Sequence, residues 1–227
     1  ERMTFLLANM SDKMTVEERF RDAGDSLDYL FGKAKQAPFS LNALTDSFVK
    51  MKTTGIDPTK GAMDGLTNAV AAFGGNDQIL HRASIAIQQM SGKGVISMEE
   101  LRQQLGEAVP SAINLMARSM DMTMGELVDK ISKGQVESTS ALNKMFGEFN
   151  RVFGGSSQAM MDTFSGKVSV AKTTMVEFAM AVGGFDREAG RFADGSLMDT
   201  INGQIQRFID LMGTTEVQLF AKNLGEG

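Results

Sequence analysis

Apolar residues recur along this chain at intervals of three and four positions, the spacing that places them on one face of an α-helix. The clearest stripe lies at 142–153 and ends at two glycines. No comparable alternation of apolar and polar residues, which would indicate a strand, occurs. We therefore predict an all-α fold, a compact multi-helix bundle of short helices. The predicted stripes are Val16, Phe20, Ala23, Leu27, Leu30 and Phe31; Leu41, Leu44, Phe48 and Met51; Ala62, Leu66, Ala69, Val70 and Phe73; Ile79, Leu80, Ala83, Ile87 and Met90; Met98, Leu101, Leu105 and Val109; Ile113, Met116, Ala117 and Met120; Leu127, Val128 and Ile131; and Leu142, Met145, Phe146, Phe149, Val152 and Phe153.

Residues that start and stop helices separate these stripes. A short polar side chain before a stripe can accept hydrogen bonds from free backbone amides, and proline fits the first helical position without losing a hydrogen bond. Ser or Thr followed three positions later by Glu predicts a capping box, in which the two residues bond reciprocally. The predicted starts are Ser40, Asp57 with Pro58, Asn76, Pro110, and the capping boxes Ser97 with Glu100 and Thr123 with Glu126; the predicted stops are Gly74-Gly75 and Gly154-Gly155.

One short pattern occurs twice, at 93–97 and at 133–137. In each copy a helix ends in Lys-Gly, two or three extended residues follow, and a new helix begins. Glycine suits the left-handed position after a helix end. One interpretation is that the two links lie beside one another as a bridge. The alternative, at least as consistent with the sequence, is that they are two ordinary connections between helices.

The pattern changes after Gly155. We predict a short helix from Ser156, a break at Ser165-Gly166, an Ala-, Met-, Val- and Thr-rich segment at 168–182, and a second break at Gly183-Gly184. This divides the chain into a compact helical domain at 1–154 and a helical appendage at 155–227. The appendage's apolar faces need the domain or another chain to cover them, which favours oligomerisation. Its last strong stripe is Leu197, Ile201, Ile205, Phe208, Ile209 and Met212.

The composition restricts the class of protein. A chain of 227 residues can bury about 70% of its unfolded surface, so it needs no disulfide or metal for stability. With no cysteine, thiol chemistry, disulfides and Cys-ligated zinc are excluded. The first residue is Glu1, which suggests an excised or processed piece, and no signal peptide is visible. The most apolar stretch, 168–185, is interrupted by Lys172 and Glu177, so we expect no transmembrane segment.

Charge and methionine content bear on the expected partners. The net charge is −5, and no basic cluster accompanies it, so we expect no sequence-specific nucleic-acid binding. Methionine accounts for 18 residues while tryptophan is absent. Flexible thioethers fill irregular gaps and tolerate changing partners. A loosely specified helical core is the favoured interpretation, and an adaptable interaction surface is the alternative.

Candidate chemistry is sparse. The single histidine, His81, lies in a predicted helix away from its apolar face, which favours a surface or edge residue over a catalytic one. The Gly-Lys pairs at 92–93 and 166–167 lack the earlier glycine and the following Ser or Thr of a phosphate loop. The acidic residues Glu17, Glu18 and Asp22 suggest a solvated face, and Glu99-Glu100 suggests a helix start. Asp186, Glu188 and Asp194 do not follow EF-hand spacing.

No residue in this sequence is therefore predicted to be catalytic, cofactor-binding or metal-binding, and no cofactor is expected. A carboxylate pair that cleaves a glycosidic bond is not excluded by sequence alone. The aromatic cleft that usually accompanies such a pair has no support, because the chain contains no tryptophan and one tyrosine. The sequence favours a protein that is not an enzyme.

The run QQMSGKGVISMEELRQQLGEAVPSAINLMARSMDMTMGELVDKISKGQV at 88–136 resembles the tape measure domain of long-tailed phage and prophage tail proteins. The shared pattern is a Gly-Lys-Gly-like turn, Glu-Leu-Arg-Gln-Gln-Leu, a Pro-led helix, then Glu-Leu and Lys-Gly. Weaker matches occur at 37–41 and at 153–155 with 165–170. The resemblance covers about 37–175. Because this pattern consists largely of residues that start and stop helices, it identifies a fold more securely than the role of any residue.

The resemblance implies a virion structural protein of the tail lumen and tip, present in the host cytoplasm during assembly. Such proteins set tail length and leave the tail ahead of DNA during ejection. The implied partners are other copies of the chain, tail tube and tail-tip or hub proteins, and tail assembly chaperones. The frequent helix breaks predict a folded module beside the length-measuring rod. The alternatives are a non-catalytic docking module for tail-tip or chaperone proteins and, more remotely, a peptidoglycan hydrolase.

Overall fold

The computed structural model describes residues 2–163, 173–174, 178, 180–186, 191–196, 198, 203 and 206–207. The all-α prediction is confirmed: strands in the described residues are limited to one two-residue pair and an isolated bridge. The helices are α1 (Arg2–Ala8), α2 (Val16–Ala34), α3 (Leu41–Lys52), η1 (Pro58–Ala62), α4 (Met63–Ala72), α5 (Asp77–Lys93), η2 (Glu99–Leu105), α6 (Gly106–Ala108), α7 (Ala112–Ser119), α8 (Met124–Ser132), α9 (Ser138–Phe153) and α10 (Ser156–Met161), where η marks a π-helical turn. The strands are β1 (Phe185–Asp186) and β2 (Arg191–Phe192).

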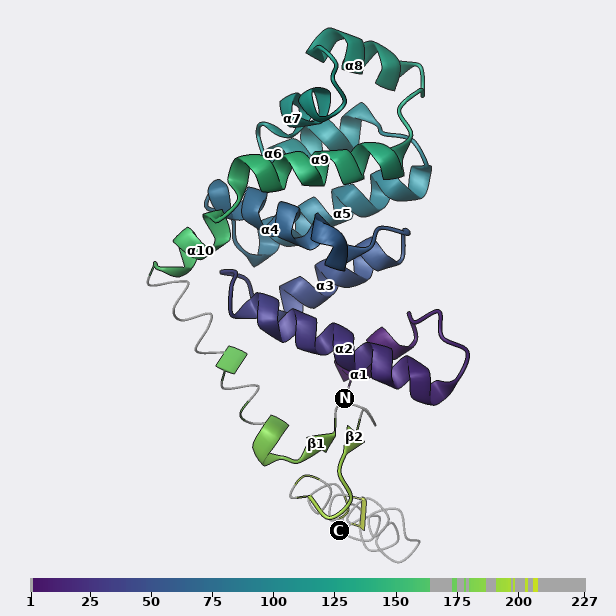
Figure 1. The fold of residues 1–227 in the computed structure, drawn as a ribbon, viewed down its shortest axis with the longest axis vertical. Helices are drawn as coiled ribbons and strands as arrows, with labels where there is room; N and C mark the ends of the chain where they lie inside the picture. The colour runs from purple at the N-terminus through teal and green to yellow at the C-terminus, as the bar shows by residue number, and fades with distance from the viewer. Residues whose placement is uncertain are drawn as a thin grey trace, which may run out of the picture.

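The helices up to α10 form an elongated stack (Figure 1). Helix α1 packs on α2, α3 packs on α2 and α5, and α9 packs on α4, α5 and α7. Helix α8 lies at one end of this stack, and the α1–α2 hairpin lies at the other. Helices α4 and α9 approach closely at Gly65, where an added Cβ would lie 2.7 Å from the carbonyl oxygen of Phe146. A larger residue at Gly65 would push the two helices apart.

Most of the predicted helix starts are confirmed. Ser40 accepts a hydrogen bond from the amide of Ala43, and Asn76 accepts from the amides of the second and third helical residues of α5. Asp57 accepts from the amide of Thr59 at 3.0 Å. The Thr123–Glu126 capping box is present in full, and a further box, which the sequence analysis did not single out, starts α2 at Thr15 and Glu18. These caps satisfy amides that have no partner within the helix.

The structure makes three corrections: it shortens the helix that begins at Pro58, and it contradicts two of the other predicted starts. The helix predicted from Pro58 is interrupted at Gly61, whose φ of 92° lies in the left-handed region, and α4 begins at Met63. Pro110 does not open α7, which begins at Ala112. The residue before a proline is disfavoured in helical backbone, and Val109 is accordingly non-helical, with φ −135° and ψ 86°. The carbonyl of Val109 accepts the amide of Ala112, so Pro110 and Ser111 form a turn that precedes α7.

The third correction is the capping box at Ser97 and Glu100, which does not form. The hydroxyl of Ser97 is buried without a hydrogen-bond partner. The carboxylate of Glu100 is buried and bonds to the ammonium of Lys93 instead. The segment that follows is the π-helical turn η2.

The predicted stripes supply the core. Most of their residues are buried, and Val16, Phe73, Val128 and Val152 are 37% to 59% exposed. The stripe residues that are partly buried against the core are Phe20, Leu41, Ile79, Met98, Ile113, Met120 and Phe153. Methionine contributes directly to this interior, in keeping with the favoured interpretation of a methionine-rich helical core. The methionines with no exposed surface are Met51, Met63, Met90, Met116 and Met145.

The repeated Lys-Gly links lie side by side, which confirms the bridge interpretation. Val95 pairs with Glu137 in an antiparallel bridge. The amide of Ile96 donates to the carbonyl of Val136 at 2.9 Å, and the amide of Ser138 donates to the carbonyl of Gly94 at 3.1 Å. The two links thus join the end of α5 to the start of α9.

Beyond α9, the predicted short helix from Ser156 is confirmed as α10, which packs against α4. Farther along, β1 and β2 pair antiparallel, with Phe185 opposite Phe192. The break predicted at Ser165-Gly166 lies outside the described residues, as do most of the segment 168–182 and all six residues of the stripe predicted at 197–212. None of the described helices is long and apolar enough to cross a membrane.

Candidate interaction surface

The α1–α2 hairpin carries the most concentrated exposed apolar surface in the described part of the chain. Phe5 is 61% exposed, Leu6 45% and Val16 59%. The ring of Phe5 meets that of Phe20 edge-on, with 6.1 Å between centroids, and Val16 lies one helical turn before Phe20. We call Phe5, Leu6, Val16 and Phe20 the N-terminal face. Contiguous apolar surface of this kind marks sites that other molecules cover.

The sequence explains why this face stays open. Phe5, Leu6 and Leu7 are consecutive, and neighbours on a helix point about 100° apart, so they cannot all pack on the same partner. Leu7 is buried against the hairpin at 2% exposure, which leaves Phe5 and Leu6 outside. Helix α1 was not predicted from the sequence, because its seven residues are too few to display a helical period. The signal that could have found it is the apolar run at 3–7.

A groove adjoins the N-terminal face. It has a volume of about 640 Å³, and Phe5 and Leu6 of α1 and Val49 of α3 contribute its apolar wall. Arg2, Asn9, Asn42, Thr45 and Asp46 also line the groove. The hydroxyl of Thr45 donates to a backbone carbonyl of α3 and lies 3.2 Å from the sulfur of Met3. Such a groove suits the aliphatic or aromatic side chains of an amphipathic helix.

A second hollow, of about 400 Å³, lies where α2 meets the segment after α3. Its lining includes Asp12, Asp22, Asp25 and Asp57, and Lys52 bonds to Asp22 at 3.3 Å. Tyr29 also lines the hollow, where burial raises its pKa to about 12 and its hydroxyl donates to the carbonyl of Pro58. The excess of carboxylates here favours basic side chains on a partner.

Helix α8, at the opposite end of the stack, exposes charged residues where the N-terminal face exposes apolar ones. Leu127 and Ile131 of α8 are buried, while Glu126, Asp129 and Lys130 are exposed. Asp129 also pairs with Lys133 at 2.7 Å. Helix α8 therefore presents charged groups to water, and its exposed apolar surface among the large hydrophobic residues is limited to Val128 at 37%.

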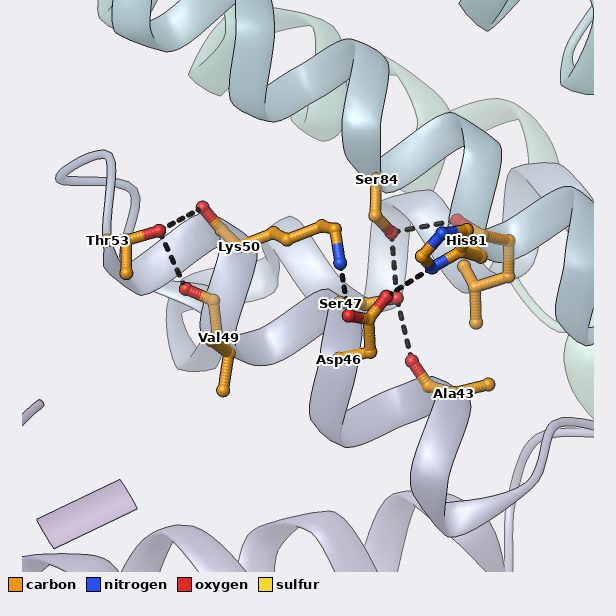
Figure 2. Close-up of polar contacts among 9 residues, drawn as sticks. Ala43, Asp46, Ser47, Val49, Lys50, Thr53, His81 and Ser84 are labelled. Atoms are coloured by element: carbon orange, nitrogen blue, oxygen red, sulfur yellow. Dashed lines mark hydrogen bonds and ion pairs between the residues drawn. The ribbon is translucent and has the colours of Figure 1, made fainter. Parts of the chain in front are cut away.

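His81 lies at the edge of α5, facing α3, with its side chain half exposed (Figure 2). Its Nδ1 is 2.6 Å from a carboxylate oxygen of Asp46, and Asp46 also pairs with Lys50. The nearby hydroxyl of Ser84 donates to that of Ser47 at 2.7 Å, and Ser47 donates to the carbonyl of Ala43. These hydroxyls are engaged within the α3–α5 contact, so the arrangement joins two helices.

The other candidates from the sequence also have structural roles. Lys93 ends α5 and pairs with Glu100, so its Gly-Lys pair is helical and not a loop. Glu18 belongs to a capping box, and hydrogen bonds from Thr15 lower its pKa. Asp186 lies in β1 and Asp194 follows β2, whereas Glu188 and the pair at 166–167 are outside the described residues. Within the described residues, no three His, Asp or Glu side chains gather as metal ligands would.

Comparison with known proteins gives one family. A family model described as "Tape measure protein" matches residues 7–186. The Mu-like prophage FluMu protein gp42 of Haemophilus influenzae is 26% identical over 94% of the chain. The probable tape measure protein of Salmonella phage Felix O1 is 36% identical over 32%, and the tape measure protein of Lactococcus phage F4-1 is 26% identical over 65%.

The matched regions are only part of these relatives. The chain spans 35% of the Haemophilus protein, 10% of the Felix O1 protein and 43% of the F4-1 protein. No solved structure matches the chain.

Proposed function

Because the chain belongs to the tape measure protein family, we propose that it is a structural component of a bacteriophage or prophage tail. In this proposal it acts in tail assembly and length determination, and at the tail tip during genome delivery. The supporting observation is the family match, which spans the stack from the last residues of α1 to α10. We place it in the lumen or tip of the virion tail, and in the host cytoplasm during assembly.

Within such a protein, we propose that this segment is a folded docking module beside the measuring rod. The short, capped helices pack into a stack with a shared core, which a single extended rod would lack. The N-terminal face and its groove are the proposed contact surface. The proposed partners are tail assembly chaperones, tail tube and tail-tip or hub proteins, and other copies of the chain.

We also propose that the two parts of the chain have different roles. Residues 1–154 form the compact domain, and residues 155–227 form a helical appendage that joins it to other parts of the assembly. Helix α10 begins this appendage, and the amide of Ser157 donates to the side chain of Asn68 in α4 at 3.0 Å. This contact gives the appendage a fixed starting direction.

In-frame deletion of residues 1–154 from the complete protein tests the proposal. Electron microscopy of the tails measures their length, and plaque counts measure infection. A tail shortened in proportion to the deletion, yet infectious, supports a measuring role for the segment. Tails of normal length that fail in assembly or infection support docking. Normal, fully infectious tails would contradict both roles.

The absence of catalysis is also a proposal. The family supports a structural role, and the polar groups around His81 are used in helix packing. We expect the purified segment to leave peptidoglycan intact in a zymogram. Lysis that disappears when a single carboxylate is substituted would instead establish the hydrolase alternative.

A further inference from the structure

Among the described residues, three Ser/Thr-x-x-Glu signals occur, and the one at the turn η2 does not form the capping box that the other two form. At Thr15 and Glu18, and again at Thr123 and Glu126, the hydroxyl accepts the Glu amide at 3.2 Å while the carboxylate accepts the Thr amide. Ser97 and Glu100 have the same spacing. At that position the capping box does not form, so an interaction with residues outside 97–100 must compete with it.

The competing interaction is the pairing of Glu100 with Lys93. Glu100 is only 4% exposed, and its Oε1 lies 2.5 Å from the Nζ of Lys93 at the end of α5. The side chain of Lys93 itself is half exposed. A carboxylate that is buried in this way loses its hydration, and the remaining partner must compensate for that loss.

The compensation is incomplete. The second carboxylate oxygen of Glu100 and the hydroxyl of Ser97 are both buried and have no hydrogen-bond partner. Buried polar atoms without partners are costly. In a capping box the same two groups would both be satisfied, as they are at Thr15 and Thr123. A capping box at Ser97 and Glu100 is therefore an alternative arrangement that would give both groups a partner.

The backbone of η2 is consistent with two arrangements. The amide of Gly106 donates to the carbonyl of Leu101, five residues earlier, so the turn holds one residue more than an α-helical turn would. Such bulges often occur at functional positions. The extra residue can be released at Val109, where the helix ends and the backbone is already non-helical.

We propose that residues 97–105 form a two-state element. In the observed state, the π-helical turn holds Glu100 inside against Lys93. In the second state the turn is α-helical, Ser97 and Glu100 form a capping box, Glu100 faces water, and Lys93 is free at the surface. Because Lys93 precedes the bridge of Val95 with Glu137, a partner carboxylate that binds Lys93 would favour the second state. The element would thereby transmit binding at that bridge to the start of α7.

A double-mutant cycle tests the proposal, with melting temperature as the readout. Ser97→Ala should not lower the melting temperature of the otherwise unaltered protein, and should raise it slightly, because it removes a buried hydroxyl that has no partner in the observed state. Lys93→Met removes the partner of Glu100 and should shift the element to the second state. In that background Ser97→Ala should lower the melting temperature by about 2–4 °C, the loss expected for a cap in a domain of this size.

Thr123→Ala is the matched control, since its box forms in both backgrounds and its loss should be the same in each. Coupling between Lys93 and Ser97 supports the two-state element. An equal effect of Ser97→Ala in both backgrounds, or none in either, would overturn it. Failure of the Lys93→Met protein to fold would also overturn it, because in the proposed second state Glu100 faces water and does not need Lys93.

A second variant tests the backbone directly. Gln103 is exposed within η2, and its deletion removes the extra residue without removing a core side chain. The deleted protein should fold, and Ser97→Ala should then destabilise it as Thr123→Ala does. Failure of this protein to fold, or indifference to Ser97→Ala, would show that the α-helical state is not accessible.

Discussion

The two ends of the helical stack are built from the same local elements and finish in opposite ways (Figure 1). Helix α2 at one end and α8 at the other both begin with a Thr-x-x-Glu capping box. Yet α8 turns charged residues outward, whereas the hairpin of α1 and α2 leaves Phe5 and Leu6 in solvent. The capping box at the start of a helix therefore does not determine whether that end of the stack exposes charged or apolar residues.

The difference lies in what each end covers. Helix α8 is one amphipathic layer over α7, and its buried stripe is narrow enough for that single contact. Helix α1 carries consecutive apolar residues, and α2 can bury only some of them. The α8 end exposes mainly charged groups, and the α1–α2 end exposes an apolar face that we propose a partner covers.

The largest effect is expected when a covered phenylalanine is truncated. Phe149 of α9 has no exposed surface and meets the rings of Phe146 and Phe153. Phe149→Ala should lower the free energy of unfolding by about 3–5 kcal/mol, from lost burial and the cavity that remains. Phe5→Ala should cost less than about 1 kcal/mol. Urea denaturation measures both, and equal losses would remove the contrast between core and open face.

The next largest effect concerns binding. Phe5→Ser combined with Leu6→Ser should weaken binding to the cognate tail assembly chaperone by about thirtyfold, because truncated anchor residues typically cost about 2 kcal/mol. Isothermal titration calorimetry on the complete protein measures the affinity. Val128→Ser in α8 is the matched control, an exposed apolar residue at the opposite end. Equal weakening by both variants would refute the assignment of the contact to the N-terminal face.

A smaller effect is expected from the capping boxes. Thr123→Ala and Thr15→Ala should each lower the free energy of unfolding by about 1 kcal/mol, because each leaves first-turn amides without a partner. The two losses should be similar, since the hydrogen bonds at the two ends are alike. Thermal unfolding measures them. A loss of stability in only one of the two variants would show that the two ends differ in their capping hydrogen bonds as well as in their exposed surfaces.

The smallest effect is a dependence on acid. Hydrogen bonds from Arg151 and Arg118 hold the pKa of Glu148 at about 2, below its ordinary value of 4.5. The stability from this lowered pKa is complete above pH 4.5 and is lost as pH falls towards 2. Both arginines are more than half exposed, so the contribution is at most about 1 kcal/mol.

Glu148→Gln tests this linkage of α7 to α9. The variant should melt at a lower temperature than the unaltered protein near neutral pH, and the two melting curves should converge as pH falls below 4.5. A difference that stays constant down to pH 2 would show that the ionised carboxylate does not contribute.

Local signals were sufficient to predict much of this fold. The caps at Ser40, Asn76 and Thr123 depend on side chains that reach amides two or three residues away, so their partners are visible in the sequence. The repeated Lys-Gly links at 93–97 and 133–137 suggested a bridge as one of two interpretations, and the contact between them decided for the bridge. The stripe of α9 was long enough to fix both its period and its end.

Non-local contacts account for what the sequence did not reveal. The box at Ser97 failed because Lys93, at the end of another helix, competes for Glu100. The N-terminal face was missed because α1 is short and because exposure of Phe5 depends on what lies beside it in space. Asp46 as a partner of His81 was hidden for the same reason, since 35 residues separate them.

The central claim is that the stack is a complete helical module with one open apolar end that serves tail assembly. Its most direct test is the yield of finished tails from phage whose complete protein carries Phe5→Ser with Leu6→Ser, compared with Val128→Ser. We predict that the first variant accumulates as a folded protein but yields few finished tails in electron micrographs, while the second yields a normal number. A normal yield of infectious tails from the first variant would contradict the account.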